Sequence, residues 1–292
     1  MDASITRIIP LMVLAALAAG CGPGRVVGPV ADAAAAATLR TALLSSEAGK
    51  AATESAPVGT GWATLKGRFL FAGTPVERTV LVVDKDMEFC SPHGMKLYDQ
   101  SLRIDPSTKG LADVVLFLRK STRVKEASPP SEPLVFDQKN CEFITPVFAS
   151  RVGQPVDVRN SDMTGHNTNI ATTPFNQSIP AQGSAIYKPA SETGMPISVT
   201  CNIHPWMKAY AVFRKDGYVA VSSVDGSFEL PDLPAGEPLE FQVWHPRAAA
   251  GLKLDRPDLK WNPKGRFQIT LEPDVLKDIG TLEVPAAALS GS

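Results

Sequence analysis

The sequence predicts an all-β protein, and three observations lead to this fold class. Beyond Trp62 the apolar residues show little of the 3.6-residue period of an amphipathic helix. Short alternating or β-branched runs recur there instead, bounded by Gly, Pro, Asn and Asp. The 292-residue chain also has 25 prolines and 22 glycines, which suit many turns and disfavour long helices.

The composition is that of a globular protein with a sizeable core, because 44% of the residues are hydrophobic and only 20% are charged. The 29 Lys and Arg nearly balance the 30 Asp and Glu. No basic run with interleaved aromatic residues, of the kind that follows a phosphate backbone, is present in the sequence. We therefore expect no nucleic acid partner.

Residues 1–20 have the pattern of a signal peptide. A short start with Arg7 precedes an apolar stretch from Ile8 to Ala19, which is too short to span a bilayer as a helix. The small residues before Cys21 resemble the lipobox of bacterial lipoproteins, which implies cleavage before Cys21 and acylation of its thiol. We expect a lipid-anchored protein of the cell envelope, facing the periplasm or the cell surface. The alternative is an ordinary secretory signal, with which the protein would still leave the cytoplasm.

Residues 21–60 are rich in Ala, Gly, Ser and Pro and have no alternating apolar pattern. This composition is typical of a tether, here between a membrane and the folded part of the chain. One short helix is expected near Thr38 to Leu44.

The strands follow from residue 61 onward. Residues 61–109 are interpreted as N-terminal strands, 110–215 as a central β-domain and 216–286 as a C-terminal β-segment. The expected strands are Leu65 to Phe71, Thr79 to Val83, Val114 to Leu118, Pro155 to Arg159, Ile197 to Cys201, Ala209 to Phe213, Phe228 to Leu230, Leu239 to Trp244 and Phe267 to Leu271.

The segment Cys201-Asn-Ile-His204-Pro-Trp-Met207 brings three metal-binding side chains together. An expected strand delivers Cys201, a tight loop returns His204 and Met207, and a second strand carries the chain away. A blue copper site needs this thiolate, imidazole and weak axial thioether, plus a second imidazole. His166, in Asn-Ser-Asp-Met-Thr-Gly-His166, follows another expected strand and is the candidate for that imidazole.

The spacing Cys201-x2-His204-x2-Met207, with the upstream pair His166-Asn167, resembles the cupredoxin family, and its short loop is similar to that of amicyanin. The resemblance implies a Greek-key β-sandwich that holds one type 1 copper ion through these two His, the Cys and the Met. It also implies that Asn167 ties the two ligand-bearing loops together by side-chain hydrogen bonds. The wider pattern resembles exported bacterial cupredoxin-like proteins often labelled methylamine-utilisation proteins.

Two stretches outside the central domain resemble the carboxypeptidase regulatory-like domain, a prealbumin-like sandwich. They are Leu65 to Gly73 and Asp225 to Gly236, which contains an Asp-Gly turn followed by alternating residues. Either the two stretches belong to one small sandwich with the copper domain between them, or they flank that domain as separate halves.

The four cysteines can be assigned by count. If Cys21 is acylated and Cys201 binds copper, Cys90 and Cys141 remain. In an oxidising compartment two remaining cysteines are expected to form a disulfide.

A competing interpretation takes Cys90-Ser-Pro-His93-Gly-Met95 as a second copper loop, because its spacing looks alike. It lacks a second imidazole other than the poorly placed His245. We interpret His245, which follows Trp244, as a packing residue at a strand end.

Two alternatives to copper are open at the main site. A Cys and two His could bind zinc, although a structural zinc site usually takes four Cys or His ligands and would leave Met207 idle. Cys201 could also be half of a structural disulfide, with Met207 and Trp206 simply buried.

The expected function is single-electron transfer. Multicopper enzymes need a second, imidazole-rich centre, and this chain has four histidines, so we do not expect an enzyme. In cupredoxins the loop histidine reaches the surface within an apolar patch. We therefore expect electrons to pass through the edge of His204, with Pro205 and Trp206 docking a c-type cytochrome, a periplasmic dehydrogenase or a terminal oxidase. Copper storage, delivery or sensing, or carbohydrate or envelope-protein binding by the prealbumin-like part, are the competing functions.

Overall fold

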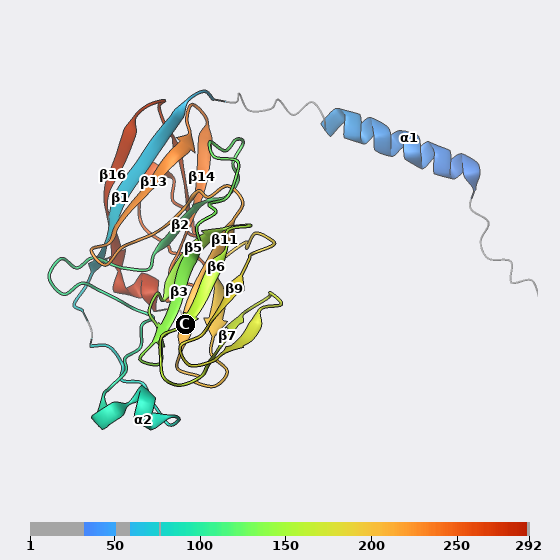
Figure 1. Cartoon of the computed structure of the whole chain (residues 1–292). Helices are drawn as coiled ribbons and strands as arrows, with labels where there is room; N and C mark the ends of the chain where they lie inside the picture. Colours follow the sequence, from blue (N-terminus) through green and yellow to red (C-terminus); the bar gives the residue numbers. More distant parts are fainter. Residues whose placement is uncertain (1–31, 51–58, 76, 291–292) are drawn as a thin grey trace, which may run out of the picture. The chain divides into compact units, whose positions relative to one another are not determined.

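The structure is a computed structural model of the whole chain (Figure 1). It describes residues 32–50, 59–75 and 77–290. The chain divides into two compact units, residues 1–54 and 55–292. The expected signal peptide and the expected lipidation site at Cys21 lie outside the described residues.

In the first unit, helix α1 (Ala33–Lys50) is longer than the helix expected near Thr38 to Leu44. Its start is capped by Asp32, whose carboxylate accepts the N–H groups of Ala34 and Ala35 at 2.9 and 3.3 Å. Alanine has the highest helix propensity, so the helix begins within the alanine run rather than after it. No helix among the described residues is both long enough and apolar enough to cross a membrane.

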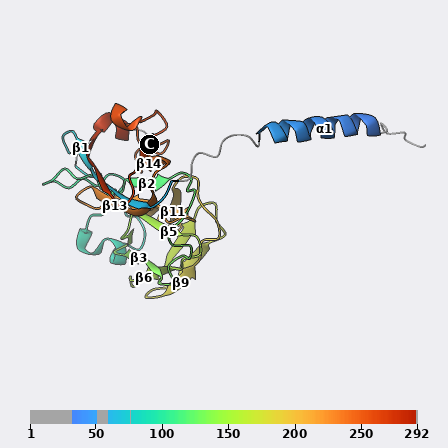
Figure 2. The same cartoon turned by 90° about the horizontal axis from the view of Figure 1, so that it is seen from above.

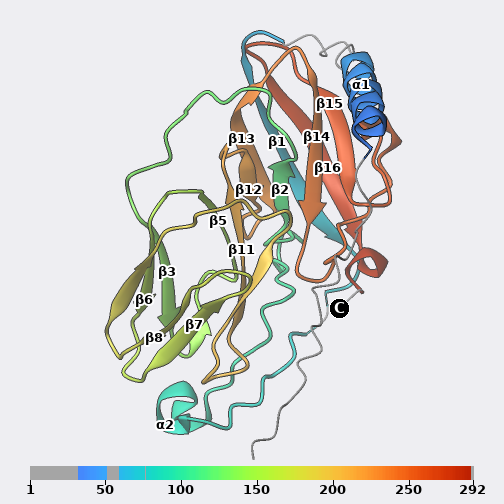
Figure 3. The ribbon, with the colours of Figure 1, turned by 90° about the vertical axis from the view of Figure 1, so that its right-hand side faces the viewer.

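The described residues of the second unit form four β-sheets, which confirms the predicted all-β fold class (Figures 1 and 3). In spatial order, sheet I contains β13 (Ser227–Pro234), β1 (Trp62–Ala72) and β16 (Leu276–Pro285). Sheet II contains β12 (Val219–Val221), β2 (Val115–Leu118), β14 (Pro238–Trp244) and β15 (Arg266–Thr270). Sheet III contains β5 (Val147–Arg151), β11 (Lys208–Arg214), β10 (Ile197–Thr200), β7 (His166–Ile170) and β8 (Asn176–Ile179). Sheet IV contains β4 (Glu142–Phe143), β3 (Leu134–Lys139), β6 (Val156–Asn160) and β9 (Ser184–Tyr187).

The sheets pack in the order I, II, III, IV, with a hydrophobic core in each space between them. Sheets I and II form one sandwich and sheets III and IV form the other. Figure 2, a view from above, separates β1 and β14 of the first sandwich from β3, β6 and β9 of the second. Val212 of β11 and Trp244 of β14 belong to the small core between sheets II and III, so the two sandwiches share buried surface.

Strand β2 lies in the first sandwich, although the sequence analysis assigned Val114 to Leu118 to the central domain. Its side chains alternate, as in any strand: Leu116 contributes to the core between sheets I and II, and Phe117 to the core between sheets II and III. Both faces are therefore buried, which explains the uninterrupted apolar run Val-Leu-Phe-Leu. The expected boundary between residues 215 and 216 would separate β2 from its partner β14.

The stretches Leu65 to Gly73 and Asp225 to Gly236 are neighbours in sheet I. Strand β1 pairs antiparallel with β13, with Leu65 opposite Leu230, and parallel with β16. Gly226 makes the turn before β13 possible, because its φ is +85° and a Cβ there would lie 2.0 Å from the carbonyl oxygen of Phe69. Of the two arrangements left open by the sequence, the structure has one small sandwich with the ligand-bearing sandwich inserted between its strands.

The expected strand at Thr79 to Val83 is absent, because this part of the chain forms a single isolated bridge between Val80 and Tyr98. Residues 79–99 instead run along the second sandwich as an extended segment. The segment contains two short helical turns, α2 (Met87–Cys90) and η1 (Pro92–Gly94). Two further helical turns in the described residues of the second unit are η2 (Pro257–Leu259) and η3 (Ala286–Leu289).

Candidate metal centre

Three of the predicted ligands lie together at one end of sheet III. His166 is the first residue of β7, Cys201 directly follows β10, and these strands pair antiparallel. The Nδ1 atoms of His166 and His204 are 2.9 Å apart, and the Cys201 Sγ is 3.8 Å from the Nδ1 of His204. Both imidazoles have no exposed surface, and Cys201 is 2% exposed. The chain therefore gathers two nitrogen donors and one sulfur donor in a buried cluster.

Main-chain hydrogen bonds close the loop that carries Cys201, His204 and Met207. The N–H of Met207 donates to the carbonyl of His204 at 2.9 Å, and the N–H of Cys201 donates to the carbonyl of Met207 at 3.3 Å. Met207 is buried on this loop. These bonds fix the loop independently of any bound ion.

Asn167 joins the two ligand-bearing segments, in the position that the resemblance implied. Its side-chain oxygen accepts the N–H of Asn202 at 3.1 Å, and its side-chain nitrogen donates to Asn176 at 2.8 Å. Its own backbone N–H donates to the Sγ of Cys201 at 3.3 Å, as does the N–H of His204 at 3.4 Å. Two N–H groups therefore aim at the sulfur, an arrangement that favours a negative charge on it.

The Cys201 thiol is strongly acidic in this environment. Burial raises its pKa, but hydrogen bonds with His166 and His204 and from two backbone N–H groups lower the pKa by more, so that it comes to about 5. At neutral pH the side chain is therefore a thiolate, the form that binds metals.

Each imidazole is oriented by a carboxylate on its far side. The Nε2 of His166 is 2.7 Å from the Oδ2 of Asp162, and the Nε2 of His204 is 2.8 Å from the Oδ2 of Asp86. A carboxylate only accepts hydrogen bonds, so in both rings the Nε2 carries the proton. Carboxylates in this position are typical of metal-binding histidines, because they fix the tautomer that leaves the other nitrogen free.

The facing Nδ1 atoms need a positive charge between them. Both Nε2 protons are donated to carboxylates, so in two neutral imidazoles each Nδ1 would carry a lone pair. These lone pairs would face each other across 2.9 Å and repel. A proton or a metal ion relieves this repulsion. Burial lowers the pKa of His166, but Asp162 and Cys201 raise it by more, so a proton is well held in the absence of metal.

The donor set suits a soft or borderline transition metal. Two imidazoles and one thiolate, whose donor atoms all lie within 4.8 Å of one another, fit copper or zinc better than magnesium or calcium, which prefer oxygen ligands. The fourth predicted ligand, Met207, is buried at the end of the same loop.

Cys90 and Cys141 are joined by a disulfide. This removes the second copper loop as an interpretation, because a sulfur in a disulfide is not a thiolate ligand, and His93 is exposed. It also removes a grouping of Cys141 with Asp162 and His166 as a separate metal site. Among the described residues, Cys201 is the free cysteine.

His245 lies at the end of β14, fully buried and outside the cluster. Its Nδ1 accepts the N–H of Arg247 at 3.1 Å. Burial lowers its pKa most, a hydrogen bond with the backbone of Ala112 raises it, and the charge of Arg247 lowers it further, so the pKa comes to about 3 and the ring is neutral.

The expectation that His204 reaches the surface is wrong. The ring has no exposed surface, and the carboxylate of Asp86 covers its Nε2 edge. The reason is the segment 79–99, which contains the turn α2 (Figure 3). Asp86 directly precedes this turn. Of the two expected docking residues, Pro205 is exposed and Trp206 is half-buried.

Sequence reasoning missed both carboxylates. Asp162 stands four residues before His166, so it could have been considered as a partner of that histidine. Asp86 is 118 residues away from His204, and no local pattern in the sequence connects the two.

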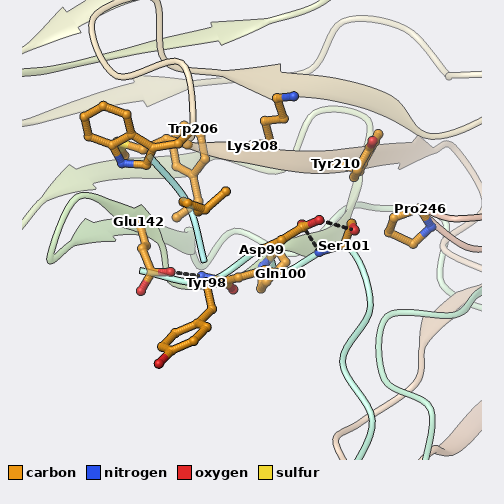
Figure 4. Close-up of a pocket in the computed structure, with 13 residues that line it drawn as sticks. Tyr98, Asp99, Gln100, Ser101, Glu142, Trp206, Lys208, Tyr210 and Pro246 are labelled. Carbon is orange, nitrogen blue, oxygen red and sulfur yellow. Dashed lines mark hydrogen bonds between the residues drawn. The ribbon is translucent and has the colours of Figure 1, made fainter. Parts of the chain in front are cut away.

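A small cavity of about 150 Å³ adjoins the ligand loop (Figure 4). Trp206, Met207 and Lys208 line it on one side, and Glu142 lines it on another, where it accepts a hydrogen bond from Gln100 at 2.8 Å. The cavity therefore reaches the predicted axial ligand from outside the cluster.

No protein-family model matches this chain, and no curated protein matches it. Solved structures that are similar to it include a mutant of amicyanin in the reduced Cu(I) form, at 17% identity and a TM-score of 0.26, over 32% of this chain and 97% of that one. The amicyanin of Paracoccus versutus is similar at 15% identity and a TM-score of 0.26, over 34% of this chain and 97% of that one. A copper-containing nitrite reductase from Thermus scotoductus is similar at 18% identity and a TM-score of 0.25, over 32% of this chain and 25% of that one. Each match covers about a third of this chain, so the chemistry of the site is taken from the chain's own residues.

Proposed function

We propose that this protein binds one copper ion through His166, Cys201 and His204, with Met207 as a weak axial ligand, and carries single electrons. The observation that supports the proposal most is the buried sulfur of Cys201 beside two imidazoles whose Nδ1 atoms face each other at 2.9 Å. Two His and one Cys with a long axial Met are the donor set of blue copper electron-transfer sites.

The chain's own residues supply the rigidity that electron transfer requires. A copper ion bound there would supply a centre that gains and loses one electron. The N–H groups of Asn167 and His204 hold the sulfur, and Asp162 and Asp86 hold the imidazoles, so the donor atoms keep their positions in both oxidation states. Burial of the cluster excludes water.

Electrons would reach a partner through Trp206 rather than through a bare imidazole edge. The ring centroids of His204 and Trp206 are 5.1 Å apart, and Trp206 is half-buried beside the exposed Pro205. A redox protein such as a c-type cytochrome, a periplasmic dehydrogenase or a terminal oxidase would dock at these two residues through a small, transient interface. The proposal includes attachment to the cell envelope through a lipid on Cys21 and no catalytic activity of the chain itself.

The visible spectrum of the full-length protein loaded with Cu(II) tests the proposal. We expect an intense thiolate-to-copper charge-transfer band that is lost in Cys201→Ser and kept in His93→Gln, because His93 is exposed and outside the cluster. A colourless protein that retains zinc in preference to copper would contradict the proposal.

Copper storage or delivery is a second candidate function, favoured by the complete burial of His204. The rate of electron exchange with a small redox protein separates the two functions. Electron transfer predicts rapid exchange that slows in Trp206→Leu, whereas storage predicts slow exchange in both proteins.

A further inference from the structure

The carboxylate of Asp86 connects the buried imidazole of His204 with the outside of the molecule. Its Oδ2 lies 2.8 Å from the Nε2 of His204, and 43% of its side chain is exposed, whereas His204 has no exposed surface. The hydroxyl of Thr164 donates to the same oxygen at 3.4 Å. Two hydrogen bonds therefore hold the carboxylate of Asp86 against the imidazole ring of His204.

The backbone around Asp86 is fixed by the turn α2. The carbonyl of Asp86 accepts the N–H groups of Phe89 and Cys90 at 2.9 and 2.8 Å. The φ of Asp86 is +47°, in the left-handed region that aspartate adopts more readily than most residues. Cys90, at the end of α2, is buried and bonded to Cys141. The disulfide thus anchors the turn that presents the carboxylate.

The other half of the disulfide organises the second imidazole. The N–H of Cys141 donates to the Oδ2 of Asp162 at 2.8 Å, and the same oxygen accepts the Nε2–H of His166 at 2.7 Å. The carbonyl of Cys141 accepts the indole N–H of Trp206 at 3.1 Å. The Cys90–Cys141 disulfide therefore joins the segments that contact both imidazoles and the ligand loop.

We infer that Asp86 is a positioning residue for His204, held in place by the Cys90–Cys141 disulfide: it accepts the Nε2–H and thereby keeps the Nδ1 of His204 unprotonated and aimed into the cluster. Without this acceptor the ring could turn or carry its proton on Nδ1, where it would face the Nδ1 of His166. The inference rests on the proposed function only for the identity of the ion that the cluster binds.

The first test uses the metal-free, full-length protein with ¹⁵N-labelled histidine. Nitrogen chemical shifts report which ring nitrogen of His204 carries the proton. All proteins in this test carry His166→Phe, because the proton that His166 holds without metal would by itself keep the Nδ1 of His204 as an acceptor. In that background we expect the Nε2–H form with Asp86 intact and in Asp86→Asn, whose side-chain oxygen still accepts a hydrogen bond, and a mixture of tautomers in Asp86→Leu. Asp84→Leu, at an exposed position on the same segment, is the matched control. An unchanged Nε2–H form in Asp86→Leu would overturn the inference.

The second test measures Cu(I) affinity against a colorimetric chelator. Loss of such an outer hydrogen bond typically weakens metal binding by about 10- to 100-fold, so we expect this loss in Asp86→Leu and little change in Asp84→Leu. Equal affinities in Asp86→Leu and the wild-type protein would count against the inference. If the tautomer changes as expected but the wild-type protein binds no copper, the positioning role stands and the proposed function fails.

The double variant Cys90→Ser/Cys141→Ser tests the role of the disulfide without leaving an unpaired thiol at either position. In the His166→Phe background we expect the same mixture of His204 tautomers as in Asp86→Leu. If this variant does not fold, the comparison of Asp86→Leu with Asp86→Asn still decides the inference, because both changes are at a partly exposed side chain. A folded double variant with the wild-type tautomer would show that the disulfide does not hold Asp86.

Discussion

The sulfur of Cys201 accepts two backbone hydrogen bonds, one from Asn167 on strand β7, which begins with His166, and one from His204 on the loop. This double contact means that the sulfur is prepared for a negative charge before any ion binds, because the charge is stabilised by groups that cannot rotate away.

The first prediction concerns the thiolate of the metal-free protein. The pKa of Cys201 is about 5, since hydrogen bonds outweigh the effect of burial. The ultraviolet absorbance of the thiolate should therefore persist from neutral pH down to about pH 5. In His166→Phe the midpoint should move to higher pH, because one of the interactions that lowers the pKa is lost. A midpoint near the usual cysteine value, about 8.5, in the wild-type protein would contradict this account.

The second prediction concerns Asp162, which accepts the N–H groups of Asn140 and Cys141 as well as that of His166. Asp162→Asn should lower the free energy of unfolding by about 1–3 kcal/mol at neutral pH, because donors are left poorly paired. Urea denaturation of the metal-free proteins measures this difference.

The pH dependence of the Asp162 effect has a defined sign. Burial raises the pKa of Asp162, but its hydrogen bonds, with that of His166 the largest, lower it by more, so the folded pKa lies below the unfolded value of about 3.9. The ionised Asp162 stabilises the folded protein at pH values above the pKa of the unfolded chain. This stabilisation is lost as the pH falls through the pKa of the folded protein. The difference between wild type and Asp162→Asn should therefore shrink in acid, and a difference that is constant with pH would rule out an ionised Asp162.

The third prediction concerns His245, whose pKa is lowered to about 3, chiefly by burial. The unfolded chain takes up a proton at about pH 6.5, whereas the folded protein does not, so stability falls as the pH drops from about 6.5 toward 3. The loss should approach about 1.4 kcal/mol per pH unit relative to His245→Phe. Denaturation series of both proteins at several pH values measure it, and parallel series would contradict the prediction.

The fourth prediction concerns the core between sheets II and III. Phe117 is 2% exposed and is part of this core, together with Trp244. Phe117→Ala should destabilise the protein by about 3–5 kcal/mol, because it leaves a cavity between the two sandwiches. Val82→Ala, at a side chain that is 80% exposed, is the control. Because the two sandwiches share this core, we expect them to unfold together, in one calorimetric transition of the wild-type protein. Two separate transitions would contradict this prediction.

The fold class could be predicted from the sequence because a strand with one solvated face leaves an alternating pattern. Val-Leu-Phe-Leu at Val115–Leu118 shows the limit of this signal. A strand buried on both faces is apolar at every position, so its sequence indicates burial but not which sheet it joins. At Thr79 to Val83 a strand was predicted where none forms. An extended segment can alternate in burial without joining a sheet.

The inner part of the candidate metal centre could be predicted from the sequence because Cys201, His204 and Met207 fall within one short loop. The outer part was not, since Asp86 reaches His204 only through a turn anchored by a disulfide to a distant strand connection. The local sequence around Asp86 contains nothing that specifies this partner. Burial of the imidazole edge follows from the same segment and was missed for the same reason.

The sandwich of sheets III and IV is inserted into the chain between two strands of sheet II. The chain leaves sheet II after Leu118 and returns to it at Val219, and these ends are adjacent, because the N–H of Leu118 donates to the carbonyl of Tyr218 at 2.9 Å. A foreign sandwich with neighbouring ends could therefore replace residues 119–218, provided that it also covered Phe117 and Trp244 of the core between sheets II and III. Residues 119–218 contain all four predicted ligands but not Asp86. The part of the chain outside the inserted sandwich therefore determines how exposed His204 is.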